Sequence, residues 1–448
     1  MDSYTIIIFG GTGDLTKSKL ISALNELVKK DNLTFNVIGI GRRELDDSTY
    51  KSFLLETNPN IDEKIIIKYF KADFEKRESL NGLDSVINSV ENETCKGRIY
   101  YLATSYHFFE YIAENLAVHS SPHKTGFTRI MVEKPFGHDL KSSNKINNAL
   151  LKHFDEEQIF RVDHYLAKQT IDNILLVRLS NPFFESTWNS QFIEKIKVVV
   201  KEDKGVGNRL GYYDKSGAVK DMIQNHLLQT AAFVLMEPPD SLEIKDLKKR
   251  KIEAINKLEF KGEILTGQYA GYRDEAASLN NPNSTTETFA EVKLLSGSKR
   301  WKSTEIILRT GKMLKKREAY IEIDYKKEPC MMYCNLTTAP NRLIMHIQPL
   351  QNIEFTMNTT MPGEESNIKP VKMTFSPTTE FKSDSAKSYA LIIKECIKGS
   401  KKMFICKNEL EATWKLTDKI TKQIKNVLPE EYEKNSTGPR WNSNKLSL

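Results

Sequence analysis

The first 160 residues alternate short apolar runs with longer amphipathic stretches, and this alternation limits the possible folds more than any other feature. Helical patterns, such as LTKSKLISALNELVKK and SYHFFEYIAENLAV, separate the apolar runs. Strands that alternate with helices form a parallel sheet with helices on both faces. We therefore expect a doubly wound domain over residues 1–165. Its predicted strands are YTIIIFG, FNVIGIG, IIIKYF, GRIYYLA and FTRIMVEK.

The pattern changes after about residue 180, where apolar runs follow one another without regular helices between them. This predicts a large, mostly antiparallel sheet, with one long helix from about Gly217 to Met236. The expected architecture is a Rossmann-like doubly wound domain followed by an α+β domain over residues 166–448. The runs of the second domain are FIEKIKVVVKE, ETFAEVKLLSG, STEIILRTG, AYIEIDYK and NRLIMHIQP.

Length and composition are those of a folded, water-soluble protein. A chain of 448 residues is too long for one ordinary core. Its 39% hydrophobic and 28% charged residues are typical of globular domains. The N-terminus MDSYTIIIFGG lacks the pattern of a signal peptide, and no run approaches the roughly 18 apolar residues of a membrane span. We expect a cytoplasmic protein that does not contact membranes.

The charge distribution argues against a nucleic-acid partner. The net charge is +7, but the lysines are spread along the chain and no stretch interleaves basic with aromatic residues. An anionic substrate and cofactor suit this mildly basic surface. The five cysteines are an odd number, and Cys330 and Cys334 lack a second ligand pair at zinc-site spacing. We expect reduced thiols and no metal.

The segment IIIFGGTGDLTKSKL ends a buried strand and opens a helix at Asp14. Gly10, Gly11 and Gly13 let the backbone approach a pyrophosphate, whose charge the amides at the helix start neutralise. The alternative is a plain strand-turn-helix. The second strand ends NVIGIGRRELDD, with Arg42 and Arg43 where NAD-specific sites often place an acid. Because a guanidinium can bind a 2′-phosphate bidentately, this position favours NADP over two ordinary surface arginines.

Two further segments follow predicted strands. In IMVEKPFGHD, Lys134 emerges at the carboxyl edge of the sheet, where such folds bind ligands; alone, it could be an ordinary loop lysine. In RVDHYLAKQT, Asp163 is an acceptor, and His164, Tyr165 and Lys168 are potential phosphate donors. An acid that caps a helix start is the alternative there.

The segment GYYDKSGAVKDMIQNHLLQ places His226 on a helix that continues as the apolar run LLQTAAFVLM. A histidine beside an apolar helix is usually structural. Asp163 nevertheless offers a carboxylate that can orient an imidazole and stabilise its charged form.

Together these segments resemble glucose-6-phosphate dehydrogenase, a family marked by GxxGDLxxxK, EKPxG, R[IV]DHYLxK and GYYDxxGxxxDMxQNHLLQ. All four stand in family order, at residues 10–19, 133–137, 161–168 and 211–229. The resemblance covers nearly the whole chain. It continues through TETF (286–289), RW (300–301), LRTGK (308–312), NRLIMHIQP (341–349), MPGEE (361–365) and ELEATW (409–414).

The resemblance implies NADP-dependent oxidation of glucose 6-phosphate at C1, with a role for each matching residue. His226 is the implied general base, Asp163 its supporting carboxylate, and Lys134 lies between sugar and cofactor. The family forms dimers or tetramers through the second domain's sheet. The implied phosphate contacts are His164, Tyr165, Lys168 and Lys316 or Arg317; the sugar contacts are Glu202, Asp221, Lys312 and Gln348; the cofactor contacts are Gly10, Gly11, Thr12, Gly13, Asp14, Leu15, Lys19, Arg42, Arg43 and Lys134.

The chain departs from the family pattern in its loops. Ser105 and Tyr106 replace a proline after the fourth strand, and Gly207 replaces an acid two residues before Arg209. The family's S-W-G-P becomes residues 436–439, STGP, and His346 replaces an arginine, which argues against a second, structural NADP site. Two alternatives stay open: a related sugar oxidoreductase with an EKP motif, and a catalytically silent NADP-binding homologue.

Overall fold

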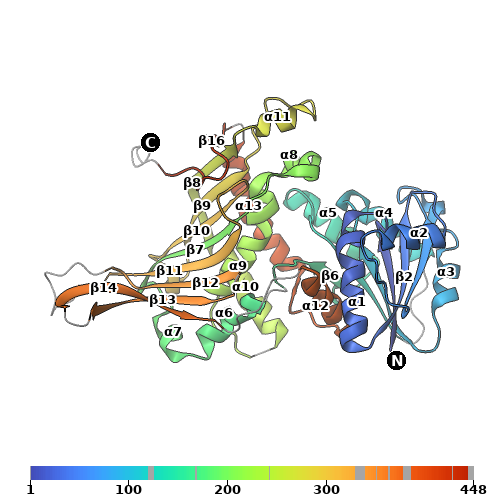
Figure 1. The fold of residues 1–448 in the computed structure, drawn as a ribbon, viewed down its shortest axis with the longest axis horizontal. Coiled ribbons are helices and arrows are strands. Elements are labelled where there is room, and N and C mark those ends of the chain that lie inside the picture. Colours follow the sequence, from blue (N-terminus) through green and yellow to red (C-terminus); the bar gives the residue numbers. More distant parts are fainter. Residues whose placement is uncertain are drawn as a thin grey trace. The chain divides into compact units, whose positions relative to one another are not determined.

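The computed structural model describes residues 2–119, 126–166, 169–241, 243–327, 339–349, 351–361, 364–376, 385–425 and 427–441. The chain divides into two compact units (Figure 1). The first comprises Met1–Ala167 and Asp384–Glu411, and the second comprises Lys168–Ser383 and Ala412–Leu448.

The first unit contains a seven-stranded sheet in the order β15-β6-β5-β4-β1-β2-β3. Strands β1 to β6 pair in parallel, and β15 is antiparallel to β6. The predicted parallel sheet is thus confirmed. Its strands are β1 (Ser3–Phe9), β2 (Thr34–Gly41), β3 (Ile65–Lys71), β4 (Cys95–Leu102), β5 (Phe127–Val132), β6 (Ile159–Val162) and β15 (Phe404–Ile405).

Helices cover this sheet because its strands are apolar on both faces. In β1, Ile6 and Ile8 belong to the core cluster that includes residues of α1 and α12. Ile7 and Phe9 point the opposite way and are also fully buried. The helical elements are η1 (Thr16–Leu20), α1 (Ile21–Asp31), α2 (Asp47–Leu55), η2 (Arg77–Leu80), α3 (Leu83–Val90), η3 (Tyr106–Phe108), α4 (Phe109–His119), α5 (Leu140–Leu151), η4 (Glu156–Gln158) and α12 (Ser385–Lys398).

The chain returns to the first unit near its C-terminus. Ile392 and Cys396 of α12 join the first unit's core cluster, and Phe404 of β15 pairs with Val162 of β6. The sequence pattern predicts a second domain that includes this segment, whereas its side chains pack in the core of the first unit. An amphipathic helix pattern shows which face is buried, but it does not show against which distant segment that face packs.

The second unit contains a nine-stranded sheet in the order β14-β13-β12-β11-β7-β10-β9-β8-β16. All neighbours pair antiparallel except β7–β10 and β8–β16. The predicted mostly antiparallel sheet is confirmed. Its strands are β7 (Ile193–Lys201), β8 (Leu258–Tyr269), β9 (Phe289–Ser296), β10 (Glu305–Gly311), β11 (Glu318–Tyr325), β12 (Arg342–Gln348), β13 (Ile353–Met361), β14 (Glu364–Phe375) and β16 (Glu430–Tyr432).

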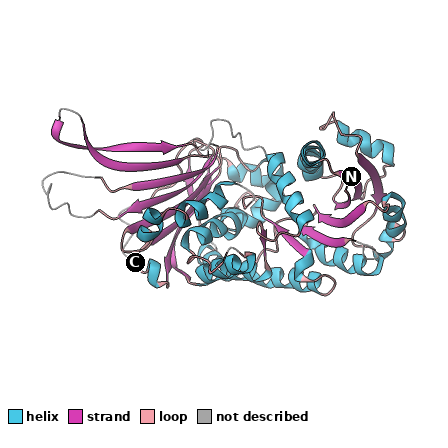
Figure 2. Cartoon of the chain, turned by 90° about the horizontal axis from the view of Figure 1, so that it is seen from below, coloured by secondary structure: helices cyan, strands magenta, loops and turns pink. Residues whose placement is uncertain are grey.

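Helices of the second unit pack along its sheet, as Figure 2 shows. None of the helices in the described ranges is long and apolar enough to span a bilayer. The helical elements are α6 (Gln169–Leu179), α7 (Pro182–Thr187), η5 (Gly207–Arg209), α8 (Leu210–Ala218), η6 (Val219–Leu227), α9 (Leu228–Leu235), α10 (Ile244–Asn256), α11 (Tyr272–Ala277), η7 (Lys299–Trp301) and α13 (Lys407–Ile424), whose residues from Ala412 onward belong to this unit.

Candidate active site

The glycine turn after β1 is shaped by close contact with neighbouring strands. The Gly10 and Gly11 amides donate to the carbonyl of Ile40 in β2, at 3.0 and 2.9 Å. Gly10 has φ +95°, and a Cβ there would lie 2.4 Å from the carbonyl oxygen of Ala103. A Cβ on Gly11 would lie 2.7 Å from the Cα of Gly39. The first two glycines are therefore required by the protein's own packing, apart from any ligand.

The helix after this turn opens as expected at Asp14, but it continues through a π-helical segment, η1. The Thr16 hydroxyl donates to the Gly10 carbonyl at 3.0 Å and ties η1 to the turn. Lys19 is partly exposed on this segment. Thr12, Gly13, Asp14 and Leu15 all retain solvent exposure, so this turn leaves room for a ligand. The sequence carried no signal for the π-helical geometry.

Arg42 and Arg43 follow the end of β2, beside the turn. A Cβ on Gly41 would lie 3.4 Å from the Thr12 hydroxyl, so the two loops are neighbours. The Arg43 guanidinium lies 5.4 Å from the Phe53 ring centroid, a cation–π contact. Arg42 is exposed, and its side chain makes no ion pair or hydrogen bond to any residue that the structure describes. Its charge is therefore available to a ligand at the glycine turn.

Glu133 and Lys134 follow β5 at the carboxyl edge of the parallel sheet. The buried Glu133 carboxylate accepts a hydrogen bond from the Tyr101 hydroxyl at 2.5 Å. Burial raises the pKa of Glu133 to about 7. The Lys134–Pro135 peptide bond is cis. Lys134 itself is partly exposed at the sheet edge, where the sequence analysis expected it.

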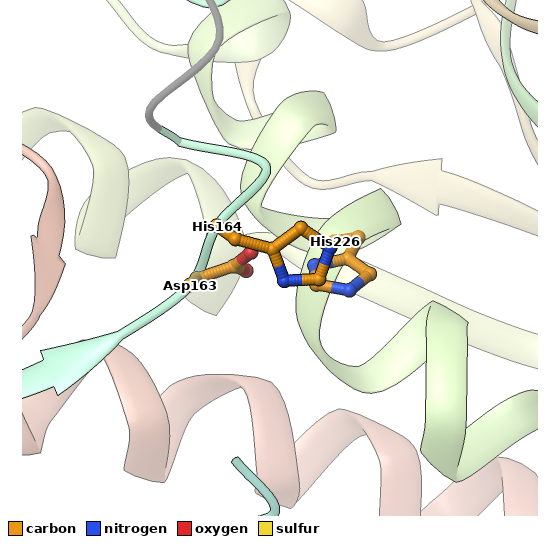
Figure 3. Close-up of side chains that lie close together, drawn as sticks. All are labelled: Asp163, His164 and His226. Carbon is orange, nitrogen blue, oxygen red and sulfur yellow. The ribbon is translucent and has the colours of Figure 1, made fainter. Parts of the chain in front are cut away.

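Asp163, His164 and Tyr165 form a turn directly after β6. Asp163 is 1% exposed, and its Oδ1 accepts the Tyr165 amide at 2.9 Å. The ring centroids of His164 and Tyr165 lie 5.3 Å apart. Figure 3 draws Asp163 and His164 on this turn and His226 on its helix. Lys168, the third predicted phosphate donor of this segment, lies outside the described residues.

Tyr389 of α12 lies beside this turn, although no sequence motif points to it. Its ring stacks on His164 with centroids 6.4 Å apart. Its phenol hydrogen-bonds Glu133, and burial together with the nearby Glu133 and Asp163 carboxylates raises the pKa of Tyr389. Only the return of residues 384–411 to the first unit brings this side chain here, and no local pattern predicts that return.

His226 and Asp221 lie on η6, a π-helical segment that continues as α9. Both are buried, at 1% and 2% exposure. The predicted helix from Gly217 to Met236 is present, but Gly217 breaks it from α8 with φ +66°, and its first half is π-helical. Such widened segments often occur at functional sites. The Thr230 hydroxyl donates to the His226 carbonyl at 2.8 Å and satisfies that group.

Four charged groups converge near the start of this helix. Lys312 forms an ion pair with Glu202, and its ammonium lies 5.1 Å from the Tyr213 ring centroid. Arg209 pairs with Asp221 at 3.1 Å. Arg209 is exposed, and although partial desolvation opposes its charged form, Asp221 raises the pKa of Arg209. The second unit thus gathers the predicted sugar contacts Glu202, Asp221 and Lys312, and adds Arg209 to them.

The remaining predicted contacts lie at the ends of strands β11 and β12. Gln348 ends β12 and is buried at 6% exposure. Lys316 and Arg317 precede β11 and are both exposed, so either can reach a ligand in solvent. The choice between them as the phosphate cation stays a prediction.

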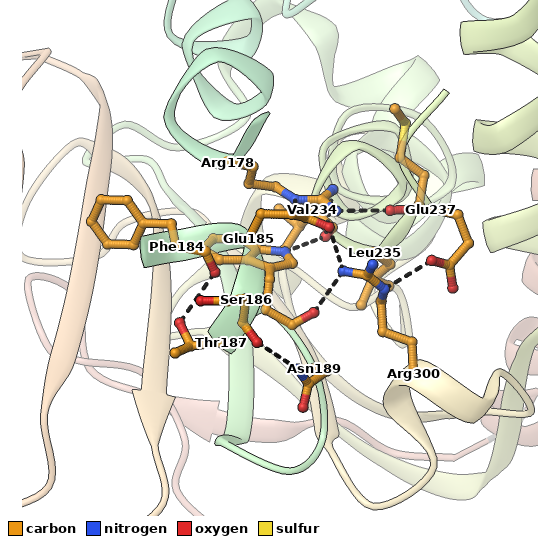
Figure 4. A network of polar contacts seen from close by, with 12 residues as sticks. Arg178, Phe184, Glu185, Ser186, Thr187, Asn189, Val234, Leu235, Glu237 and Arg300 are labelled. Atoms are coloured by element: carbon orange, nitrogen blue, oxygen red, sulfur yellow. Dashed lines mark hydrogen bonds and ion pairs between the residues drawn. The ribbon is translucent and has the colours of Figure 1, made fainter. Parts of the chain in front are cut away.

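Buried side chains donate hydrogen bonds to the carbonyls at the carboxyl end of the His226 helix. Arg178 is fully buried and donates to the carbonyls of Phe233 and Met236, each at 3.0 Å. Figure 4 shows Arg178 and Arg300 around Glu185 at this helix end. Cationic donors satisfy the last carbonyls of a helix and complement its dipole. The helix that carries His226 therefore ends in a fixed position.

Comparison with known proteins connects both units to one family. The sequence model for "Glucose-6-phosphate dehydrogenase, NAD binding domain" matches residues 7–173. The model for "Glucose-6-phosphate dehydrogenase, C-terminal domain" matches residues 175–447. The glucose-6-phosphate 1-dehydrogenase of Chlamydia muridarum is 33% identical, over 95% of this chain and 91% of its own length. That of Bacillus subtilis is 32% identical, over 97% and 95%.

Solved structures agree with this assignment. A glucose-6-phosphate dehydrogenase in complex with its substrate glucose 6-phosphate superposes with a TM-score of 0.88 at 27% identity. The match covers 98% of this chain and 96% of that one. A levoglucosan dehydrogenase, at a TM-score of 0.53 and 9% identity, shares the fold alone. From its two matched domains and its full-length relatives, the chain belongs to the glucose-6-phosphate dehydrogenase family.

Proposed function

We propose that the chain oxidises D-glucose 6-phosphate at C1 to 6-phospho-D-glucono-1,5-lactone with NADP, the first step of the oxidative pentose phosphate pathway. The observation that carries this proposal is the family match over both units, in a chain that retains Asp163, His164, Lys168 and His226. The named relatives act as glucose-6-phosphate 1-dehydrogenases, and one solved relative contains glucose 6-phosphate.

The first unit fits an NADP molecule at its glycine turn. Gly13 and the amides at the start of η1 suit a pyrophosphate, because a helix start favours negative charge. The exposed Arg42 suits the 2′-phosphate, and Arg43, stacked on Phe53, flanks it. When bound there, NADP supplies the nicotinamide that accepts hydride. The remaining proposed contacts are Gly10, Gly11, Thr12, Asp14, Leu15, Lys19 and Lys134.

His226 is the proposed general base. As the C1–H bond breaks and its electron pair leaves as hydride, the C1 hydroxyl proton passes to a ring nitrogen of His226, and a C=O bond forms. A base with a pKa near neutral suits this step. Asp163 stabilises the resulting imidazolium, as a carboxylate does in other histidine-based sites. The Tyr165 amide holds the Asp163 carboxylate in orientation at 2.9 Å. Lys134 is the proposed contact between sugar and cofactor.

Different side chains are proposed for the phosphate and for the sugar hydroxyls. His164, Tyr165, Lys168 and Arg317 (or Lys316) are the proposed phosphate donors. Glu202, Asp221, Lys312 and Gln348 are the proposed contacts of the sugar hydroxyls. The ion pair between Lys312 and Glu202 supports this role, because it places a donor and an acceptor side by side. Buried hydrogen-bond donors that lack an acceptor destabilise a complex. The proposed phosphate contacts therefore make the 6-phosphate of the substrate obligatory.

We also propose that the protein is a cytoplasmic homo-oligomer. The second unit's sheet is the proposed interface of a homodimer or homotetramer, and its strands β13 and β14 carry the exposed apolar side chains Met357, Val371 and Met373. A cytoplasmic location is supported by the buried thiols of Cys95 and Cys396, which form no disulfide.

A steady-state assay of the purified full chain tests the function. Glucose 6-phosphate and free glucose are each supplied with NADP or NAD, and the absorbance of the reduced nicotinamide is followed. We expect reduction with glucose 6-phosphate and faster turnover with NADP. Equal turnover of free glucose would favour a related sugar oxidoreductase instead. No turnover with any pair, in a protein that still binds NADP, would favour the silent homologue.

A further inference from the structure

The TETF segment, Thr286–Phe289, lies where η6 begins, although no proposed chemical step uses it. Glu287 approaches the backbone of Gly217 so closely that a Cβ there would lie 2.3 Å from its Oε1. Gly217 also has φ +66°. Both features require glycine at position 217, and they bring a carboxylate to the amino end of the helix that carries His226.

The Glu287 carboxylate is a hydrogen-bond acceptor at this helix start. Its Oε1 accepts the Val219 amide at 3.0 Å, and its backbone carbonyl accepts the Ala218 amide at 2.9 Å. Glu287 is 8% exposed, so water contributes little to these contacts. The first amides of a helix lack partners within the helix, and a carboxylate there also complements the helix dipole. Glu287 therefore fixes the first turn of η6.

The same segment fixes Lys312. The Thr288 carbonyl accepts the Lys312 amide at 3.0 Å. The Tyr432 hydroxyl donates to the Lys312 carbonyl at 2.7 Å and lies 2.9 Å from the Thr288 hydroxyl. One short segment thus holds the helix of Asp221 and His226 and the backbone of Lys312.

We propose that Glu287 is a positioning residue, which keeps Asp221 and His226 at their places relative to Lys312 by holding the start of η6. This inference deepens the proposed function and rests on it. The contact is made by shape and hydrogen bonding, since both the neutral and the ionised carboxyl group can accept the Val219 amide.

The surroundings of Glu287 support this view. Lys220, Tyr213 and Tyr272 are titratable groups that interact with it. Burial raises the pKa of Glu287 to about 7, against the smaller opposing effect of hydrogen bonds to its carboxylate. A neutral glutamine is therefore a fair replacement, whereas alanine removes the acceptor.

Glu287→Ala, Glu287→Gln and the parent are compared in the full chain, with Ile323→Ala as a matched control. Ile323 is fully buried in β11, outside both η6 and the TETF segment, so its truncation destabilises the same unit without removing a hydrogen bond to η6. We expect Glu287→Ala to lower kcat about tenfold or more, since small misplacements near a reacting group are costly. The kcat of Glu287→Gln should stay within about threefold of that of the parent. Ile323→Ala should have a lower Tm, but its kcat should equal that of the parent when it is assayed at temperatures well below this Tm.

Amide hydrogen exchange over residues 219–226 gives a second readout, which does not depend on turnover. Glu287→Ala should exchange faster there than the parent, and Glu287→Gln should not. Unchanged exchange, or a kcat loss matched by Ile323→Ala, would overturn the positioning role. An inactive parent would refute the proposed function, while altered exchange would still report the contact. If Glu287→Ala does not fold, Glu287→Asp, which is one methylene too short, takes its place.

Discussion

The Arg209 guanidinium donates to the buried carboxylate of Asp221 at 3.1 Å. Arg209 ends η5, and Asp221 lies on η6, so this pair ties the loop after β7 to the helix of His226. The chain lacks the acid that its family usually places at position 207, and Arg209 uses Asp221 as a partner. The arginine thus keeps a charge partner despite this departure.

Restoring an acid with Gly207→Glu should lower the stability of the protein. Gly207 has φ +58°, a left-handed conformation that costs other residues about 1–2 kcal/mol. We expect the free energy of unfolding, measured by urea titration, to fall by roughly that amount. Gly211→Glu is the matched control, because Gly211 lies in α8 and no described atom lies within 4 Å of an added Cβ. Equal effects of the two changes would contradict the backbone explanation.

Arg42→Ala should weaken NADP binding by roughly 1.5–3 kcal/mol, the scale of a hydrogen bond to a charged group. NAD binding should hardly change, because NAD lacks the 2′-phosphate. Arg43→Ala is the comparison, because the Arg43 side chain stacks on Phe53. This change should weaken NADP binding less than Arg42→Ala does. Dissociation constants of both cofactors, from calorimetric titration, check this. A loss shared equally by NADP and NAD would make Arg42 a structural residue.

Glu133 should make the stability of the protein depend on pH. Its folded-state pKa, raised to about 7 by burial, exceeds the ordinary value of 4.5, so the folded chain binds a proton more tightly than the unfolded chain. Its contribution to the free energy of unfolding must therefore fall as pH rises through that window. The parent's advantage over Glu133→Gln should shrink by roughly 1–3 kcal/mol between pH 5 and pH 8.

Urea titrations at both pH values measure this difference. Glu157→Gln, an exchange of the same kind at an exposed site, serves as the control and should give no such trend. A parent advantage that is the same at pH 5 and pH 8 would show that Glu133 does not titrate in this range.

His226→Asn keeps a polar group of similar size but removes the proposed base. We expect kcat to fall by roughly 10²–10⁴, the usual contribution of a positioned general base, while KM changes little. The acidic limb of the kcat/KM profile should disappear. His153→Asn, at an exposed histidine after α5, should leave both unchanged.

Asp163→Asn should also lower kcat, by leaving the imidazolium without its carboxylate. The double variant should cost much less than the product of the two single effects, because residues that act as a unit are not additive. A folded His226→Asn protein with most of its turnover would rule out this base, and Lys134 would become the first alternative.

Local patterns predicted the elements whose apolar side chains lie in a core. The five apolar runs became β1 to β5, and the glycines at residues 10, 11 and 13 formed the expected turn. What the sequence did not predict depends on distant partners. The stacking of Tyr389 on His164 needs the return of α12 to the first unit. The hydrogen bond from the Val219 amide to Glu287 and the ion pair between Arg209 and Asp221 likewise join different segments. The local pattern of each segment does not predict its partner.

In the proposed reaction, hydride leaves C1 of glucose 6-phosphate for NADP. Glucose 6-phosphate with deuterium at C1 tests it most directly, with the NADPH mass measured after turnover. We expect NADPH one mass unit heavier than that from unlabelled sugar, and a slower rate if hydride transfer limits kcat. NADPH of ordinary mass from the labelled sugar, or no NADPH at all, would contradict it.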